Sequence, residues 1–206
     1  MAVVLAKDPL NIIICGVGGQ GNILASELLA SSLVEQGFFT TVGETYGASQ
    51  RGGSVMSHVR ISSKRQYGVL IPRGDADIII GFEPMETLRI ARDFGNHGTK
   101  VIFDPRPNYP LGVLSGEAMY PEIKAIKAEL DYLCGLVKVL DATRLAQEAG
   151  NAQAANILLM GALTALPEVP LNQEDYVLVL GQRFQGKALD LNLRAFQAGY
   201  EAVIAS

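Results

Sequence analysis

Two glycine-rich segments hold the residues of this chain that are best suited to bind a ligand. The first is GVGGQG at residues 16–21, and the second is YGASQRGGS at residues 46–54. Glycine permits tight turns and close approach of the backbone, so the N–H groups of such a turn can hold an anion. The guanidinium of Arg51 can add a bidentate pair of hydrogen bonds to a carboxylate or a phosphate. The two segments therefore predict an anion-binding site.

The first segment lies where a strand is expected to end and a helix to begin. The run Asn11–Cys15 is apolar and β-branched, and Asn22–Gln36 has apolar residues at helical spacing. This context gives the spacing G-x-G-x-x-G its meaning as a phosphate-binding turn. An ordinary dinucleotide site also needs an acidic residue about 20 residues further on, and Glu44 is the nearby candidate. Ordinary NAD binding, and glycines that serve only tight packing of strand against helix, both stay open as alternatives.

The second segment has two interpretations that we keep side by side. In one, Arg51 binds a ligand while Tyr46 and Gln50 orient that ligand by hydrogen bonds. In the other, it is a surface loop whose arginine pairs with a neighbouring carboxylate or with a partner subunit. The residues that we expect to contact a ligand or cofactor are Gly16, Gly18, Gly19, Gln20, Gly21, Tyr46, Gln50, Arg51, Gly52 and Gly53.

Five further side chains are weaker candidates. His58 is expected to be a structural hydrogen-bonding residue, and His97 to lie in a solvated turn. Glu83 stands after a buried strand, where it either serves function or stabilises the start of a helix. Asp104 is expected to form a turn, and Cys15 to be a small buried apolar residue. We assign no catalytic residue and no metal ligand.

The elements that must position these residues alternate between buried strands and helices. We expect strands at Asn11–Cys15, Phe38–Val42, Ser54–Ser62, Asp77–Phe82, Lys100–Phe103 and Leu136–Leu140, with Tyr67–Ile71 forming a hairpin with Ser54–Ser62. We expect helices at Asn22–Gln36, Pro84–Phe94, Pro121–Leu130 and Ala142–Ala149 and through most of the chain after Gln153, and a loop at Gly43–Gly53.

This pattern predicts an α/β fold: a Rossmann-like open, mainly parallel sheet with a β-hairpin and a helical C-terminal region. The first forty residues would form a βαβ unit with a right-handed crossover. At 206 residues, the chain is expected to form a single domain, 1–206.

Charge, apolar runs and cysteine spacing argue against several kinds of binding partner for this chain. The net charge is −4 and the densest basic pair is Lys64–Arg65, so the chain lacks the basic face of a nucleic-acid-binding protein. No stretch approaches the roughly 20 apolar residues that span a bilayer, and Met1–Leu10 lacks the features of a signal peptide. We therefore expect no membrane partner and a cytoplasmic location. Cys15 and Cys134 have no metal-binding spacing.

Three stretches of this sequence resemble one family. GVGGQG after an apolar strand, GETYGASQRGGSVMSHVR and LIPRGDADIIIGFEPMETLR are similar to the gamma (catalytic-domain) family of 2-oxoacid:ferredoxin oxidoreductases. The match is specific over Ile12–Arg89 and returns more weakly at Asn156–Leu163. Within the family, SQRGGSV resembles the beta subunits of indolepyruvate ferredoxin oxidoreductases.

The resemblance implies half of an enzyme. Such complexes oxidatively decarboxylate a 2-oxoacid, here indolepyruvate or another arylpyruvate, with coenzyme A as acyl acceptor and ferredoxin as electron acceptor. Thiamine diphosphate, Mg and iron–sulfur clusters would lie on a large partner subunit, and this chain would be inactive alone. By analogy, both glycine segments would face one crevice at the carboxyl ends of the strands.

Alternatives to this interpretation stay open. The chain could serve another oxoacid, such as 2-oxoglutarate, pyruvate or a branched-chain oxoacid. It could also be a stand-alone nucleotide-binding dehydrogenase or a nucleotide-sensing module. In isolation it could form a homodimer through apolar residues of its C-terminal helices.

Overall fold

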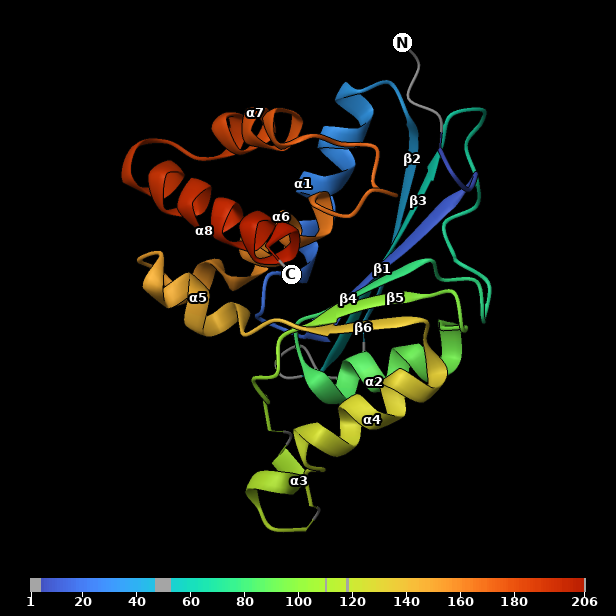
Figure 1. Ribbon diagram of the computed structural model, residues 1–206, viewed down its shortest axis with the longest axis vertical. Helices are drawn as coiled ribbons and strands as arrows, with labels where there is room; N and C mark the ends of the chain where they lie inside the picture. Colours follow the sequence, from blue (N-terminus) through green and yellow to red (C-terminus); the bar gives the residue numbers. More distant parts are fainter. Residues whose placement is uncertain (1–4, 47–52, 110, 118, 206) are drawn as a thin grey trace.

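A six-stranded sheet forms the centre of the protein, and helices cover both of its faces (Figure 1). The computed structural model describes residues 5–46, 53–109, 111–117 and 119–205. The strands lie in the order β2-β3-β1-β4-β5-β6. Their bounds are Leu10–Val17 (β1), Phe39–Tyr46 (β2), Ser54–Ser62 (β3), Ile78–Gly81 (β4), Lys100–Phe103 (β5) and Leu136–Val139 (β6). Strands β1, β4, β5 and β6 are parallel, whereas β3 runs antiparallel to both of its neighbours, β1 and β2.

The helices fill the intervals between strands and most of the C-terminal third. Their bounds are Asn22–Glu35 (α1), Pro84–Phe94 (α2), Leu111–Leu114 (α3), Ile123–Leu133 (α4), Ala142–Glu148 (α5), Ala155–Thr164 (α6), Gln173–Arg183 (α7) and Gly186–Ile204 (α8). A short 3₁₀ turn, Ala152–Ala154 (η1), leads into α6. None of the helices in these described residues has the length and apolar character that crossing a membrane requires.

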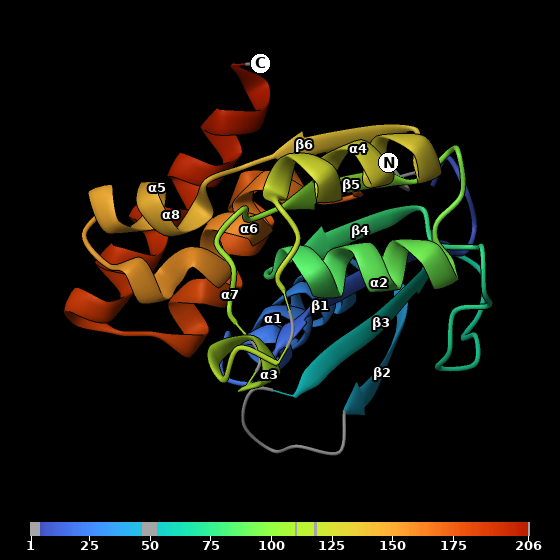
Figure 2. The same cartoon turned by 90° about the horizontal axis from the view of Figure 1, so that it is seen from below.

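Alternation along β1 divides its side chains between two cores. Ile12 and Ile14 pack into a core with α1, α5, α6, α7 and α8, whereas Ile13 and Cys15 pack into a second core with α2 and α4. Figure 2 shows α2 and α4 together on one side of the sheet, away from α6 and α8. Because both faces are covered, β1 is buried along its whole length.

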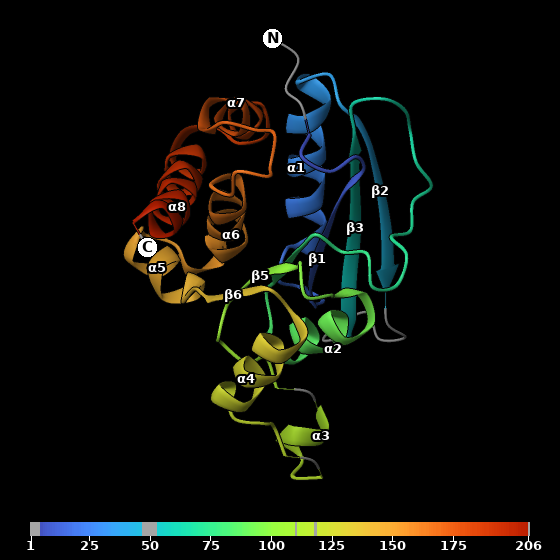
Figure 3. The same ribbon diagram turned by 45° about the vertical axis from the view of Figure 1, so that its right-hand side comes forward.

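Helix α6 is the most deeply placed helix of the first core. All its residues from Asn156 to Thr164 are buried, and it lies between α1 and α8 (Figure 3). Two glycines allow α6 and α8 to approach closely. A Cβ added at Gly161 would lie 2.0 Å from Phe196 O, and one added at Gly199 would lie 1.8 Å from Leu158 O.

Most of the expected elements are confirmed. Ser54–Ser62, Lys100–Phe103 and the helix Pro84–Phe94 have the expected bounds. The helical C-terminal region is confirmed too, with breaks before α7 and at the start of α8. Asp141 caps α5, because its carboxylate accepts a hydrogen bond from Arg144 N at 3.2 Å.

Two expectations around β3 are wrong. The stretch Gly43–Tyr46 is not loop but the second half of β2, since its residues pair with β3 from Gly43 opposite His58 onward. Residues 67–71 form no strand. Both edges of β3 are already occupied, by β1 and by β2, so the expected hairpin has no edge left to use. The guanidinium of Arg60 instead holds this segment by donating to Gly68 O and Leu70 O, each at 3.1 Å.

The fold does contain a β-hairpin, but it is formed by the antiparallel strands β2 and β3. We expected β3 to pair instead with the segment that follows it. Strand β2 runs parallel to β1, as a βαβ unit requires. However, β3 lies between the two strands, so β1 and β2 are not hydrogen-bonded to each other.

Candidate functional site

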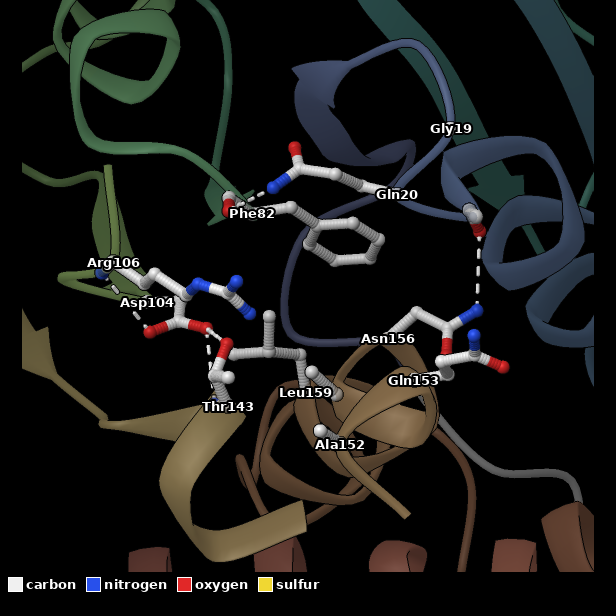
Figure 4. Close-up of a pocket in the computed structure, with 12 residues that line it drawn as sticks. Gly19, Gln20, Phe82, Asp104, Arg106, Thr143, Ala152, Gln153, Asn156 and Leu159 are labelled. Carbon is white, nitrogen blue, oxygen red and sulfur yellow. Dashed lines mark hydrogen bonds between the residues drawn. The ribbon is translucent and has the colours of Figure 1, made fainter. Parts of the chain in front are cut away.

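A pocket of about 460 Å³ opens at the carboxyl ends of the parallel strands (Figure 4). The chain leaves β1 for α1 on one face of the sheet and leaves β4 for α2 on the other. Ligands of open α/β sheets bind in the crevice at such a divergence. The pocket is lined by Gly19, Gln20, Gly21, Phe82, Asp104, Arg106, Thr143, Ala152, Gln153, Ala155, Asn156 and Leu159.

The first glycine segment forms one wall of this pocket. Gly19 and Gly21 have φ values of +102° and +83°, a backbone region that favours glycine. A Cβ at Gly21 would also lie 2.3 Å from Asn156 Nδ2 on α6. The first N–H groups of a helix have no intrahelical partner, and Gly21, which precedes α1, provides no side-chain cap for them. The turn therefore presents backbone donors beside the pocket.

Gln20 has a structural role in this turn. Its Oε1 accepts a hydrogen bond from Val17 N at 2.8 Å, and its Nε2 donates to Phe82 O at 2.8 Å. The side chain thereby ties the end of β1 to the end of β4. Gly16 must be small for the same reason, because its Cβ would lie 2.6 Å from Gln20 Oε1. A ligand contact through this amide would replace one of its two hydrogen bonds.

The second glycine segment contacts the first through Gly53, which the structure describes. Gly18 N donates to Gly53 O at 2.8 Å, which joins the two segments at the carboxyl edge of the sheet. Tyr46 pairs with Val55 at the end of β2, whereas Gln50, Arg51 and Gly52 lie outside the described residues. The binding roles expected of these residues stay predictions.

Asp104 and Thr143 hold the opposite wall. The buried Asp104 carboxylate accepts hydrogen bonds from Thr143 Oγ1 at 2.6 Å, Thr143 N at 3.0 Å and Arg106 N at 3.2 Å. Burial raises the pKa of Asp104, and these hydrogen bonds oppose that rise. The contacts fix the start of α5 to the end of β5. Asp104 thus forms the turn expected of it and also anchors a helix.

Glu83 lies beside this region and stabilises the start of α2. Its carboxylate accepts from Glu86 N at 2.8 Å, from Asn108 N at 3.4 Å and from the Tyr120 hydroxyl. Burial raises the pKa of Glu83, and the bond from Tyr120 lowers it. These contacts favour the structural interpretation: Glu83 caps α2 and holds the segment between β5 and α4.

The remaining candidates lie away from the pocket. His58 is buried, and its Nδ1 accepts from Ile71 N at 3.2 Å, which makes it the structural residue that we expected. His97 is exposed. Cys15 is fully buried, and burial raises the pKa of its thiol. Burial also raises the pKa of Cys134, to about 11.

The strand order separates Glu44 from the glycine turn. Glu44 lies on β2, where it accepts a hydrogen bond from Ser26 Oγ at 3.3 Å. Because β3 lies between β1 and β2, Glu44 is two strands, or about 10 Å, from the strand that carries the turn. An ordinary dinucleotide site has its acidic residue on the strand adjacent to β1. This arrangement argues against the ordinary NAD site.

Sequence reasoning missed the pocket residues that follow other strands. Arg106 follows β5, Thr143 begins α5, and Gln153 and Asn156 begin the segment that closes the pocket from the helical side. A signal for Arg106 was present, because it stands between Pro105 and Pro107 directly after a buried strand. Within the described ranges, no group of three or more His, Cys, Asp or Glu residues could hold a metal ion.

Comparison with known proteins gives matches over nearly the whole chain. Residues 11–202 match the pyruvate ferredoxin/flavodoxin oxidoreductase family. The chain is 40% identical over 193 residues to "Indolepyruvate oxidoreductase subunit IorB" of Pyrococcus horikoshii, an alignment that covers 93% of this chain and 95% of that protein.

Two solved structures share the fold, each at 24% sequence identity. One is the gamma subunit of a keto/oxoacid ferredoxin oxidoreductase from Geobacter sulfurreducens, with a TM-score of 0.68 over 95% of this chain and 99% of that chain. The other is 2-oxoglutarate:ferredoxin oxidoreductase from Magnetococcus marinus with 2-oxoglutarate, coenzyme A and succinyl-CoA bound. Its TM-score is 0.74 over 97% of this chain, which corresponds to 32% of that longer chain.

Proposed function

The chain belongs to the pyruvate ferredoxin/flavodoxin oxidoreductase family, and from that premise we propose that it is the small subunit of a thiamine-dependent 2-oxoacid:ferredoxin oxidoreductase. The complex decarboxylates indolepyruvate or another arylpyruvate oxidatively to the acyl-CoA, in the cytoplasm. The observation that carries this proposal is the 40% identity, over 93% of this chain, with a protein that is itself named a subunit of indolepyruvate oxidoreductase.

The cofactors of this chemistry are assigned to the partner subunit. An iron–sulfur cluster needs several thiolates, but the two cysteines of this chain are isolated, and burial raises both thiol pKa values. The sequence also contains no GDG segment of the thiamine-binding type. The residues of this chain therefore do not fit either group. A large subunit would hold thiamine diphosphate, Mg and the clusters, and would pass electrons to ferredoxin.

This chain would bind coenzyme A or the oxoacid and would help to enclose the reacting groups. The glycine turn at residues 16–21 and the segment that ends at Gly53 meet through the Gly18–Gly53 hydrogen bond. Together they would present backbone N–H groups and the Arg51 guanidinium to the phosphates of coenzyme A or to the carboxylate of the oxoacid. Placed against the large subunit, this edge of the sheet would also exclude water from the reacting groups.

Affinity purification of the full chain from its native cells tests the subunit assignment. The expected result is a brown complex that contains thiamine diphosphate and reduces a viologen dye with indolepyruvate and coenzyme A. Activity with 2-oxoglutarate, pyruvate or a branched-chain oxoacid in place of indolepyruvate would move the proposal to another substrate. A colourless chain that is isolated alone or as a homodimer and binds NAD would contradict it.

Substitution of Arg51 tests the role of the second glycine segment. Arg51→Ala should raise the KM for coenzyme A or for the oxoacid, or should weaken the association of the two subunits. Steady-state kinetics and size-exclusion chromatography of the complex measure both effects. Unchanged kinetics in an intact complex would remove Arg51 from the site.

A further inference from the structure

Arg106 differs from every other arginine in the described part of the chain, because its guanidinium has no partner there. Ion pairs with carboxylates or hydrogen bonds to protein oxygen atoms are made by Arg73, Arg89, Arg92, Arg144 and Arg194. The guanidinium groups of Arg65 and Arg183 stack on aromatic rings. Arg60 does both. An unpaired guanidinium at the edge of a pocket is available to a ligand.

The backbone around Arg106 is held in place before any ligand binds. Pro105 and Pro107 have fixed φ angles, and a residue that precedes proline has a restricted conformation. Arg106 N also donates to Asp104 Oδ1, and the Asp104 carboxylate is anchored on Thr143 by two further hydrogen bonds. The arginine therefore projects from a rigid support, which suits a binding group.

Arg106 borders more than one hollow. The pocket of about 460 Å³ adjoins a second hollow of about 320 Å³, and both include Gly19, Gln20, Arg106 and Thr143 in their walls. In Figure 4 the Arg106 side chain extends into the first of them, between Phe82 and Thr143. Together the two hollows have the size of a site for a whole small molecule rather than for one carboxylate group.

The rest of the described pocket lining suits a nucleoside. Phe82 and Leu159 supply apolar surface, while the Gln153 amide can hydrogen-bond to ring or sugar atoms. The Asn156 amide already donates to Gly21 O at 3.4 Å and accepts from Ile157 N at 2.9 Å, so it can add only a second bond at each end. The other charged residue in the lining is Asp104, and its carboxylate already accepts three hydrogen bonds. Arg106 is thus the group in this lining that is free to offset the charge of an anion.

We propose that Arg106 binds a phosphate group at the nucleotide end of coenzyme A, with the nucleoside in the pocket between Phe82 and Asn156. The identity of the nucleotide rests on the proposed function. Arg106 acts in binding rather than in the chemical step, so it determines the affinity for the acyl acceptor and leaves the oxoacid unaffected.

The test uses the reconstituted complex with Arg106→Gln. We expect the KM for coenzyme A to rise about 10- to 100-fold, as the loss of a charge-assisted pair of hydrogen bonds predicts. The inhibition constant of adenosine 3′,5′-bisphosphate, measured in competition with coenzyme A, should rise in parallel. The KM for the oxoacid should stay within about twofold, and Arg106→Lys should recover part of the loss because it restores the charge but not the fork.

Arg73→Gln is the matched control. Arg73 is another exposed arginine, and its side chain pairs with Asp93 at the end of β4 away from the pocket. Its loss should leave the KM for coenzyme A and the inhibition constant of the bisphosphate unchanged. Three results would overturn the proposal: constants within about twofold of wild type in Arg106→Gln, an equal rise in Arg73→Gln, or a rise in the KM for the oxoacid instead.

Direct titration of the full chain with adenosine 3′,5′-bisphosphate separates this proposal from the proposed function. If the wild-type complex oxidises no 2-oxoacid, the proposed function fails, and the titration alone decides the role of Arg106. Weaker binding to Arg106→Gln than to wild type would support that role, and equal binding would overturn it.

Discussion

His58 links the stability of the sheet to pH. It is buried on β3, accepts a hydrogen bond from Ile71 N at 3.2 Å, and forms a T-shaped pair with the Phe94 ring, with 5.5 Å between ring centroids. Burial, and then the positive charge of Arg60, lower the pKa of His58 from its ordinary value of 6.5. The folded protein therefore favours the neutral imidazole, which is the form that can accept this bond.

We predict that His58 makes the protein less stable in mild acid. The pKa of His58 is lower in the folded than in the unfolded state, so its contribution is present above pH 6.5 and is lost as the pH falls below that value. His58→Asn should show a smaller fall in the free energy of unfolding between about pH 8 and about pH 5. Urea unfolding at a series of pH values measures the difference.

His97→Asn is the matched control for this prediction, because His97 is the other histidine of the chain and is exposed. Its pH profile should follow that of the wild type. The buried carboxyl groups of Glu83 and Asp104 titrate in all three proteins, so their effect cancels in the comparison. Identical profiles for wild type and His58→Asn would show that the imidazole has no such role.

Single residues were predictable from the sequence where local geometry decides their role. The glycine turn at residues 16–21 could be found because its spacing and its place between strand and helix are local properties. The two prolines beside Arg106 were a local signal too, but its place in the pocket could not be predicted, because it depends on β5 lying next to β4 and on α6 closing the pocket. Gln20 was expected to bind a ligand, but its amide also ties two strands together, a contact 62 residues apart in sequence.

Whether a segment forms a helix or a strand was easier to predict than which strands lie next to each other in the sheet. The buried strands and the breaks among the C-terminal helices follow from apolar runs, glycines and prolines. The insertion of β3 between β1 and β2 does not, because the alternation in residues 54–62 defines a strand but not its neighbours. That insertion explains both wrong expectations, the loop at Gly43–Tyr46 and the strand at Tyr67–Ile71.

The crossing of α6 and α8 depends on two glycines. We predict that Gly199→Ala destabilises the protein by about 1–3 kcal/mol or more, because the new methyl group overlaps a backbone atom that cannot easily move. Its Cβ would lie 1.8 Å from Leu158 O. Thermal and urea unfolding measure the change.

Gly181→Ala is the matched control for the helix crossing. Gly181 also lies inside a helix, α7, but a Cβ there meets no described atom within 4 Å beyond its chain neighbours and the nearby backbone of its own helix. This substitution should stabilise the protein by ~0.5–1 kcal/mol through helix propensity. If both variants changed stability by the same amount, close approach of α6 and α8 would not be the reason for glycine at position 199.

The two cores of the molecule share one sheet, so we propose that they unfold as a single domain. Leu29 on α1 and Leu130 on α4 are both fully buried, on opposite faces of that sheet. Leu29→Ala and Leu130→Ala should each cost about 2–5 kcal/mol and should shift one and the same cooperative transition. Calorimetry tests this, because two separable transitions would divide the chain into two folding units.

The prolines on either side of Arg106 have a consequence for the entropy of binding. Ordering the backbone of one residue costs about 1–2 kcal/mol, and at this segment much of that cost is met when the protein folds rather than when a ligand arrives. A variant with Pro105→Ala and Pro107→Ala would keep the guanidinium but would bind a phosphate ester more weakly. Titration calorimetry should place the loss in the entropy of binding rather than in its enthalpy.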